Sequence, residues 1–242
     1  MKAMIFAAGL GTRLKPLTDT MPKALVPLAG KPLLQWQVEK LRDAGITDII
    51  VNVHHFPDMI IDAIRANKGW GCNITVSDER DLLLDTGGGL KKAVAGYGLR
   101  GTEEPILACN VDILSNIDIR ALVSEYERTG ISQLVVSERE TQRYLCFDEQ
   151  EMLCGWTNIA TGELKGEEGR HLAFSGMQML SSEVLTLLSQ LPQDKFSLID
   201  FYLSLLYTQA APLKAFVPKD YRMMDVGKID QITEAEAFAE SL

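Results

Sequence analysis

The sequence predicts an α/β fold with a doubly wound, mostly parallel sheet and an inserted antiparallel lobe. Through the first 138 residues, short apolar runs alternate with helical patterns of about a dozen residues, which is typical of parallel strands joined by right-handed crossovers. From residue 139 the apolar runs become shorter and alternate with polar residues, which is typical of antiparallel hairpins. We therefore expect a single domain over residues 1–242, with a main part (1–138), a lobe (139–212) and a closing segment (213–242).

Helices of the main part are expected where apolar residues recur at offsets of three and four between prolines and glycines. The triplet Gly87–Gly89 is expected to form a flexible turn before a short helix around Leu90–Ala95. Other helices are expected from Pro32 to Gly45, from Pro57 through Ile60, Ile61 and Ile64, and through Ile119, Leu122, Val123 and Tyr126. The expected strands are Met1–Ala7, Asp48–Val53, Asn73–Ser77, Pro105–Asn110 and Gln133–Ser137.

Beyond the main part, short strands are expected on both sides of a glycine-containing polar stretch, and helical patterns return before the end. The expected strands are Tyr144–Phe147, Met152–Trp156 and Leu213–Val217, and the expected helices are Glu183–Leu191, Leu198–Tyr207 and Ile229–Ala239.

The composition is ordinary for a globular protein, with 46% apolar and 24% charged residues among 242. No window holds about 18 uninterrupted apolar residues, so we expect no membrane partner. The N-terminus lacks the features of a secretory signal, which favours a cytoplasmic location. The four cysteines form no C-x-x-C pair and are expected to be free thiols: Cys72, Cys109, Cys146 and Cys154.

The formal net charge of −9 argues against a nucleic-acid partner, but it conceals a local reversal of charge. Residues 1–31 carry five basic side chains against one acidic side chain, a net +4, which leaves −13 for the other 211 residues. This segment contains the loop Ala8-Gly9-Leu10-Gly11-Thr12-Arg13, directly after the first strand. Glycines let backbone amides approach a phosphate or a base, and open α/β sheets bind ligands at the carboxyl ends of their strands. We therefore expect an anionic ligand at this loop.

Two common phosphate-binding motifs are absent from the loop. The dinucleotide fingerprint requires a third glycine where Leu14 stands, and no G-x-x-x-x-G-K-[ST] sequence occurs. A NAD-binding module is therefore disfavoured.

The segment AAGLGTRLKPLTDTMPKALVPLAGKPLL resembles the signature of the sugar-1-phosphate nucleotidyltransferases, G-x-G-T-R-[LM]-x-P-L-T followed by P-K and G-[KR]-P. The resemblance is strongest to the short bacterial N-acetylmuramate-1-phosphate uridylyltransferases, which share the T-G-G-G turn. It implies a Rossmann-like, glycosyltransferase-A-type sheet that binds nucleotide in the main part and sugar in the lobe. Further matches spread over the chain are Asp85–Gly89, Asn110–Asp112, Phe174–Gly176 and Asp225–Gly227.

The resemblance implies Mg²⁺-dependent transfer of a nucleotidyl group from a nucleoside triphosphate, with UTP favoured, to a sugar 1-phosphate for cell-wall or surface-glycan precursors. Such chemistry needs no protein nucleophile, and the main task is to position two polyanions and cancel their charge. Arg13 is expected to hold the triphosphate and the leaving pyrophosphate, and Lys23 the two reacting phosphates. Asp112 and Asp225 are expected to bind the metal. The chain departs from many members at Val111, where they have glycine.

The resemblance also implies the contacts with base and sugar. Main-chain groups of Ala8 and Gly9, and of the turn Thr86-Gly87-Gly88, are expected to contact the base, although the glycines could instead only shape the start of a helix. Gly11 and Thr12 complete the expected nucleotide site. The expected sugar-binding residues are Gly176, Asn158 and Asp200, with Glu163 as a further candidate.

Some charged residues near these motifs have a less specific expected role. Lys15 and Lys31 are expected to contribute positive field. His54 and His55 are adjacent on a strand and point to opposite faces, so we expect packing or rim roles rather than a metal pair.

Several alternatives remain open at this point. Within the family, mannose-1-phosphate guanylyltransferase or thymidylyltransferase activity would use the same residues. A non-catalytic, nucleotide-binding regulatory paralogue is the alternative from another class. The base, the sugar and the oligomeric state are not determined by these patterns.

Overall fold

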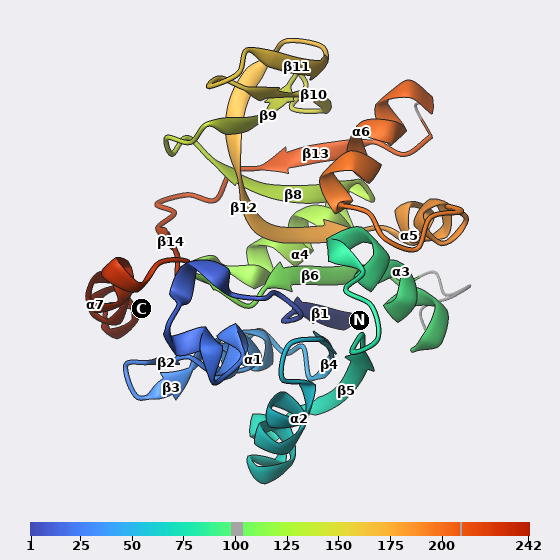
Figure 1. Cartoon of the computed structure of the whole chain (residues 1–242). Helices are drawn as coiled ribbons and strands as arrows, with labels where there is room; N and C mark the ends of the chain where they lie inside the picture. The colour runs from blue at the N-terminus through green and yellow to red at the C-terminus, as the bar shows by residue number, and fades with distance from the viewer. Residues whose placement is uncertain (98–103, 209) are drawn as a thin grey trace.

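Four parallel strands form the centre of the fold, in a computed structural model that describes residues 1–97, 104–208 and 210–242 (Figure 1). Their order is β6-β1-β4-β5, so the chain starts in the middle of the sheet and winds outward in both directions. The predicted doubly wound sheet is confirmed, and each of these strands was expected within about a residue of its bounds. The strands are β1 (Lys2–Phe6), β4 (Asp48–Val53), β5 (Asn73–Asp78) and β6 (Ile106–Asn110).

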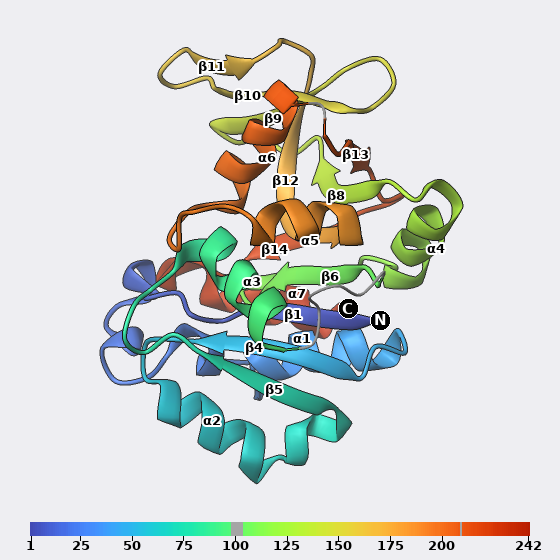
Figure 2. The ribbon, with the colours of Figure 1, turned by 90° about the vertical axis from the view of Figure 1, so that its right-hand side faces the viewer.

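Side chains of the parallel strands alternate between two hydrophobic cores. Ala3 and Ile5 belong to one core, whereas Met4 and Phe6 belong to the other. Because helices cover both faces, the strands read as continuous apolar runs. The first core includes residues of α1 (Leu33–Asp43), α2 (Pro57–Ala66), α4 (Ile119–Thr129) and α7 (Ile232–Glu240). The second includes residues of α3 (Asp85–Gly96), α5 (Ser182–Ser189) and α6 (Leu198–Thr208), the helices that face the viewer in Figure 2.

A long strand that the sequence analysis did not predict, β12 (Arg170–Leu180), carries the main sheet into the lobe. It pairs antiparallel with β6, and its pairing with β8 (Ser132–Ser137) shifts register between Phe174 and Gln178. This irregularity surrounds Gly176, whose φ is +70°. It interrupts the alternation of inward and outward side chains by which a strand is recognised in a sequence, so the strand was not predicted. The predicted antiparallel lobe is confirmed in β9 (Arg143–Phe147), β10 (Leu153–Asn158) and β11 (Glu163–Gly166); β13 (Leu213–Phe216) runs parallel beside β8.

The glycine triplet lies inside α3, and the prediction of a flexible turn before that helix is wrong. A Cβ on Gly87 would lie 2.4 Å from the ring of Phe196, and a Cβ on Gly88 would lie 2.0 Å from the carbonyl oxygen of Asp194. The close approach of this segment therefore requires glycine, and tertiary packing outweighs the poor helix propensity of these residues.

Two small sheets complete the described fold. The strands β2 (Pro27–Leu28) and β3 (Lys31–Pro32) form a short hairpin before α1. The strands β7 (Ile113–Ser115) and β14 (Met223–Asp225) pair antiparallel, which brings the end of the chain back to the segment after β6. The last expected helix starts later than predicted, because Ile229–Gln231 forms a 3-10 turn. Among the described residues, no helix has the length and apolarity that a membrane crossing requires.

Candidate active site

The predicted catalytic residues meet near the carboxyl ends of β1 and β6. Lys23 lies on a 3-10 turn and forms an ion pair with Asp112, which follows β6. Their side chains are only 9% and 20% exposed, so the pair is shielded from solvent. Arg13 lies in the loop after β1, and its Nη2 is 3.6 Å from Oδ2 of Asp225, with both side chains about half exposed. Two cations and two carboxylates from distant parts of the chain thus form one corner.

The pairing of β7 with β14 brings the two aspartates together. Asp225 lies opposite Ile113, the residue after Asp112. The N–H of Val226 donates to the carbonyl oxygen of Asp112 at 2.9 Å. Val111, where many family members have glycine, is buried in the first core, and its N–H donates to Phe6. Val111 thus extends the backbone pairing of β6 with β1 by one bond, and Asp112 follows directly after it.

Two glycines make room for the side chains of this corner. Gly11 has a φ of +64°, and a Cβ there would lie 2.7 Å from Cγ2 of Thr18. The Thr18 hydroxyl donates to the carbonyl oxygen of Gly11 at 2.8 Å, which holds the loop in this conformation. A Cβ on Gly227 would lie 2.8 Å from Nη2 of Arg13. Larger residues at these positions would displace the loop or the guanidinium.

A cavity of about 370 Å³ opens beside the glycine loop. Ala8, Gly9 and Thr86 line it, so the structure brings together three residues that were predicted to bind the nucleotide. A Cβ on Gly9 would meet no atom of the described residues within 4 Å, so packing inside the protein does not require glycine there. The other lining residues, which the sequence analysis missed, are Phe6, Asn52, Leu83, Asp85 and Lys195.

The backbone amides of Gly87 and Gly88 do not face this cavity as donors. Both N–H groups donate to the carbonyl oxygen of Phe196, at 2.9 and 3.2 Å. These two amides are thus already bonded within the protein, and the glycines lie at the start of α3, as in the alternative stated above; the contact of this segment with the base stays a prediction. Thr12 is exposed and lies in the 3-10 turn Thr12–Leu14, and the carbonyl oxygen of Gly11 accepts the N–H of Leu14.

A buried polar network positions the start of the glycine loop. Oδ1 of Asn52 accepts the N–H of Ala7 at 2.7 Å, and its Nδ2 donates to Glu79 at 2.8 Å. Glu79 also accepts the N–H of Leu84. Burial raises the pKa of Glu79, although these two donors oppose the shift. A lone amide inside the apolar run DIIVNV was the available signal in the sequence.

The lobe contains a separate cavity of about 470 Å³. Asp200, one of the residues predicted to contact the sugar, lines it and lies 3.9 Å from Nζ of Lys165. Asn158 does not line it, because its side chain accepts the N–H of Ala160 in the β10–β11 turn. Glu163 pairs with Lys165 at 3.6 Å. Lining residues that the sequence analysis missed include Arg139, Arg143, Tyr144, Trp156 and Phe174.

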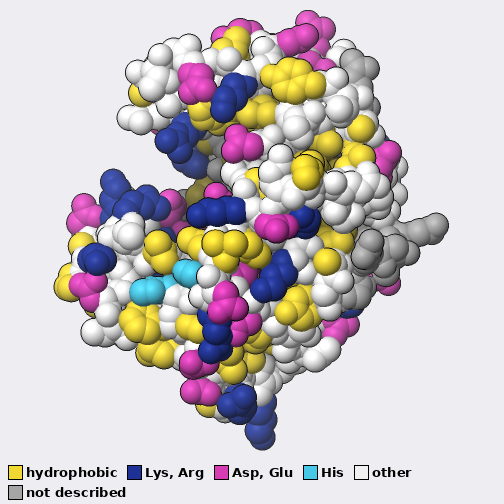
Figure 3. Space-filling view, turned by 45° about the vertical axis from the view of Figure 1, so that its right-hand side comes forward, with side chains coloured by type: hydrophobic (Ala, Val, Ile, Leu, Met, Phe, Trp, Pro, Cys, Tyr) yellow, Lys and Arg dark blue, Asp and Glu magenta, His cyan; other side chains and the backbone are white. Residues whose placement is uncertain are grey.

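Gly176 lies on β12, next to the segment that carries Asp112. A Cβ on Gly176 would lie 3.0 Å from Nδ2 of Asn110 and 2.9 Å from Cγ1 of Ile113, two residues that flank the segment containing Asp112. Phe174, two residues earlier, lines the lobe cavity. Figure 3 shows a hollow between the lobe and the main body, with Lys and Arg side chains on both rims.

The remaining predicted cations have partners outside this corner. Lys15 pairs with Asp19 at 2.9 Å on the surface. Lys31 pairs with Glu39 at 2.6 Å and lines a different cavity. His54 and His55 bond to backbone carbonyl oxygens of Glu79 and Thr18, respectively, in agreement with rim or packing roles.

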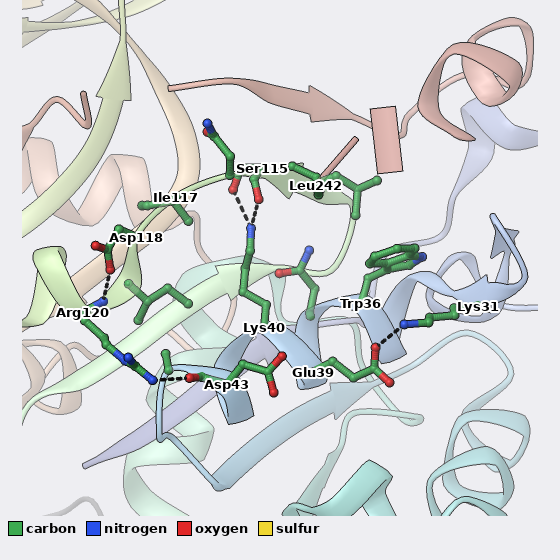
Figure 4. Close-up of a pocket in the computed structure, with 15 residues that line it drawn as sticks. Lys31, Trp36, Glu39, Lys40, Asp43, Ser115, Ile117, Asp118, Arg120 and Leu242 are labelled. Carbon is green, nitrogen blue, oxygen red and sulfur yellow. Dashed lines mark hydrogen bonds and ion pairs between the residues drawn. The ribbon is translucent and has the colours of Figure 1, made fainter. Parts of the chain in front are cut away.

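The cavity that contains Lys31 measures about 570 Å³ and lies between α1, β7 and the start of α4 (Figure 4). Lys40 projects across it and donates to the carbonyl oxygen and the hydroxyl of Ser115. Burial lowers the pKa of Lys40 to about 8, because the bonds to Ser115 supply no negative charge. This lysine joins α1 to β7, the strand beside Asp225.

The fold and this corner define an α/β protein that presents paired cations and carboxylates near the glycine loop after its first strand. The chain belongs to the nucleotidyl transferase family, whose pattern it matches over residues 2–241. The sequence predictions of family and fold are thereby confirmed.

Individual relatives match parts of the chain. It is 39% identical over 147 residues to an N-acetylmuramate alpha-1-phosphate uridylyltransferase of Caulobacter vibrioides, covering 57% of this chain and 59% of the relative. It is 43% identical over 121 residues to the protein of that name from Neisseria meningitidis serogroup B, covering 50% and 51%. The alignments thus span about half of these relatives. HddC from Yersinia pseudotuberculosis, solved in complex with GMP-PN, superposes with a TM-score of 0.77 at 26% identity, covering 98% of this chain and 99% of HddC.

Proposed function

We propose that this protein transfers a nucleotidyl group from a nucleoside triphosphate to a sugar 1-phosphate and releases pyrophosphate. The observation that carries the proposal is the convergence of Arg13, Lys23, Asp112 and Asp225 at one corner next to the glycine loop. Family membership and the two uridylyltransferase relatives support the same reaction class.

The proposed reaction is an in-line displacement at the α-phosphorus. An oxygen of the sugar phosphate forms the new P–O bond, while the bond from the α-phosphorus to the oxygen bridging to the β-phosphate breaks, and the electron pair leaves with pyrophosphate. A phosphate monoester is largely dianionic at neutral pH, so it needs no general base. Lys23 places a compact positive charge between the reacting groups, and the planar guanidinium of Arg13 holds the departing phosphates.

Asp112 and Asp225 form a donor set that suits Mg²⁺. The ion usually binds one or two carboxylates and takes its other ligands from substrate phosphates and water. Asp225 is about half exposed and Asp112 is largely buried, and each forms an ion pair with a cation that the phosphates of the substrates would attract. When bound, Mg²⁺ would neutralise phosphate charge, and we propose that these two residues hold it.

UTP and an amino-sugar 1-phosphate are the substrates we propose, since the two curated relatives described above carry uridylyltransferase names. Guanylyl transfer is the second candidate, because the structurally similar HddC was solved with the guanine compound GMP-PN. The cavity beside Gly9 and Thr86 is also lined by the charged residues Asp85 and Lys195, which are candidates for base selection.

The decisive experiment measures pyrophosphate release from UTP, GTP, dTTP, CTP and ATP against a panel of sugar 1-phosphates. We expect activity with at least one pair, and loss of activity in excess EDTA. Lys23→Ala and Asp112→Asn should each lower turnover by at least about a hundredfold, since removal of one preorganised charge contact typically costs 10²–10³. Arg65→Ala removes an exposed cation on α2 and serves as the control.

Circular dichroism of each variant separates lost chemistry from lost folding. Near-wild-type turnover in folded Lys23→Ala and Asp112→Asn would refute the proposed mechanism. Nucleotide binding without pyrophosphate release from any pair would instead favour the non-catalytic paralogue.

A further inference from the structure

A cluster of metal-ligating side chains lies in the lobe, apart from the corner that contains Asp112 and Asp225. The Sγ of Cys146, a carboxylate oxygen of Glu168 and a ring nitrogen of His171 all lie within 4.8 Å of one another. Among the described residues, this is the one group of three or more such ligands at that spacing. The proposed reaction assigns no role to any of the three.

Strand register explains why these residues meet. Cys146 on β9 lies opposite His171 on β12, and residues opposite each other in an antiparallel pair project to the same face. Glu168 precedes β12, and its Oε2 lies 3.1 Å from Nε2 of His171. The cluster therefore rests on two paired strands and the turn that leads into one of them.

The segment that carries Glu168 contacts a second thiol, that of Cys154. The Sγ of Cys154 lies 3.7 Å from the carbonyl oxygen of Glu168, and a Cβ on Gly169 would lie 2.9 Å from the same sulfur. Cys154 is at the register shift of β10, next to Gly155, which pairs with Cys146. Cys154 therefore lies beneath the segment that carries Glu168.

The surroundings attract a cation and allow it to enter. The Cys146 thiol is buried at the base of the cluster, whereas the side chains of His171 and Glu168 are 37% and 66% exposed. The carboxylate of Glu168, 3.1 Å from the ring of His171, supplies negative charge that favours a positive ion at this position.

We propose that Cys146, Glu168 and His171 bind a borderline-soft divalent cation of the Zn²⁺ type. Zn²⁺ takes thiolate sulfur, imidazole nitrogen and carboxylate oxygen in tetrahedral sites, whereas Mg²⁺ prefers oxygen ligands alone. The donor set therefore selects a different metal from the one proposed at the catalytic corner. At neutral pH the Cys146 thiol would give up its proton as the metal–sulfur bond forms.

The proposed metal site lies next to the wall of the lobe cavity. The ring of His171 stacks on Tyr144, with centroids 5.6 Å apart and planes 19° apart. Tyr144 lines the lobe cavity, and its hydroxyl oxygen accepts the N–H of Thr141. A metal bound to His171 holds this ring in place and thereby stiffens one wall of the cavity.

The experiment measures Zn²⁺ affinity of the whole chain by competition with a chromogenic chelator, in millimolar Mg²⁺ so that oxygen-only sites are masked. Wild-type protein should bind one equivalent, and Co²⁺ in its place should show thiolate-to-metal charge transfer. Cys146→Ser should abolish that band. His171→Asn and Glu168→Gln alter exposed side chains, and each should weaken Zn²⁺ binding by at least about tenfold.

Matched controls test the assignment of the ligands. Cys72→Ser removes a partly buried thiol just before β5, and His55→Asn removes a partly exposed imidazole; both should bind Zn²⁺ like wild type. Asp112→Asn should also retain binding, which separates this site from the catalytic corner. Absence of stoichiometric binding by wild type, or unchanged affinity in both Cys146→Ser and His171→Asn, would overturn the proposal.

Discussion

Replacing Lys40 with methionine is expected to change how the stability of the protein depends on pH. Burial lowers the pKa of Lys40 from 10.5 to about 8, and its bonds to Ser115 provide no counter-charge. Each tenfold change in a protonation equilibrium corresponds to about 1.4 kcal/mol, so keeping this ammonium charged inside the fold costs about 3 kcal/mol. Methionine has a similar length and carries no charge.

Proton linkage determines whether the stability rises or falls with pH. Below about pH 8, Lys40 is charged in both folded and unfolded chains, and the folded state bears the full desolvation cost. Between about pH 8 and 10.5 the folded chain releases this proton while the unfolded chain keeps it, so the stability rises with pH. Relative to Lys40→Met, wild-type protein should gain about 2 kcal/mol in free energy of unfolding between about pH 7.5 and 10.

Urea titrations at several pH values measure this difference. At pH 7 the variant should lie within about 1 kcal/mol of wild type, because the hydrogen bonds lost at Ser115 offset the relieved charge. Lys219→Met, at an exposed position, should follow the wild-type pH dependence and serves as the control. Parallel curves for wild type and Lys40→Met would refute the lowered pKa.

Three further substitutions test the cavities and the packing beneath them. Gly9→Ala should raise the KM for the nucleotide about tenfold with unchanged Tm, because the added Cβ meets only the open cavity; Gly96→Ala, also unobstructed, should leave KM unchanged in the same steady-state assay. Gly88→Ala should lower the free energy of unfolding in urea by at least about 2 kcal/mol, since its Cβ would overlap the carbonyl oxygen of Asp194. Trp156→Ala should raise the KM for the sugar phosphate alone; an equal rise for the nucleotide would argue against a sugar site in the lobe.

Local sequence patterns alone predicted the strands of the parallel core and the basic glycine loop. Strands buried on both faces must be apolar throughout, so Asp48–Val53 is recognisable without knowledge of its neighbours. The concentration of positive charge in residues 1–31 likewise depends only on composition. The family signature then selected Arg13, Lys23 and two aspartates from many charged residues.

Only the tertiary structure decided which of these residues share a site. The pairing of β7 with β14 places Asp225 beside Asp112, and it depends on contacts between segments far apart in the chain. The surroundings of Gly87 and Gly88 likewise depend on the distant segment around Phe196. Its carbonyl oxygen accepts both of their N–H groups, and its atoms occupy the space that a Cβ would need. The cluster around Cys146 arises from the register of β9 against β12, a strand whose bulge at Gly176 obscured its alternation. Strand register and close packing are long-range properties, and local residue patterns do not specify them.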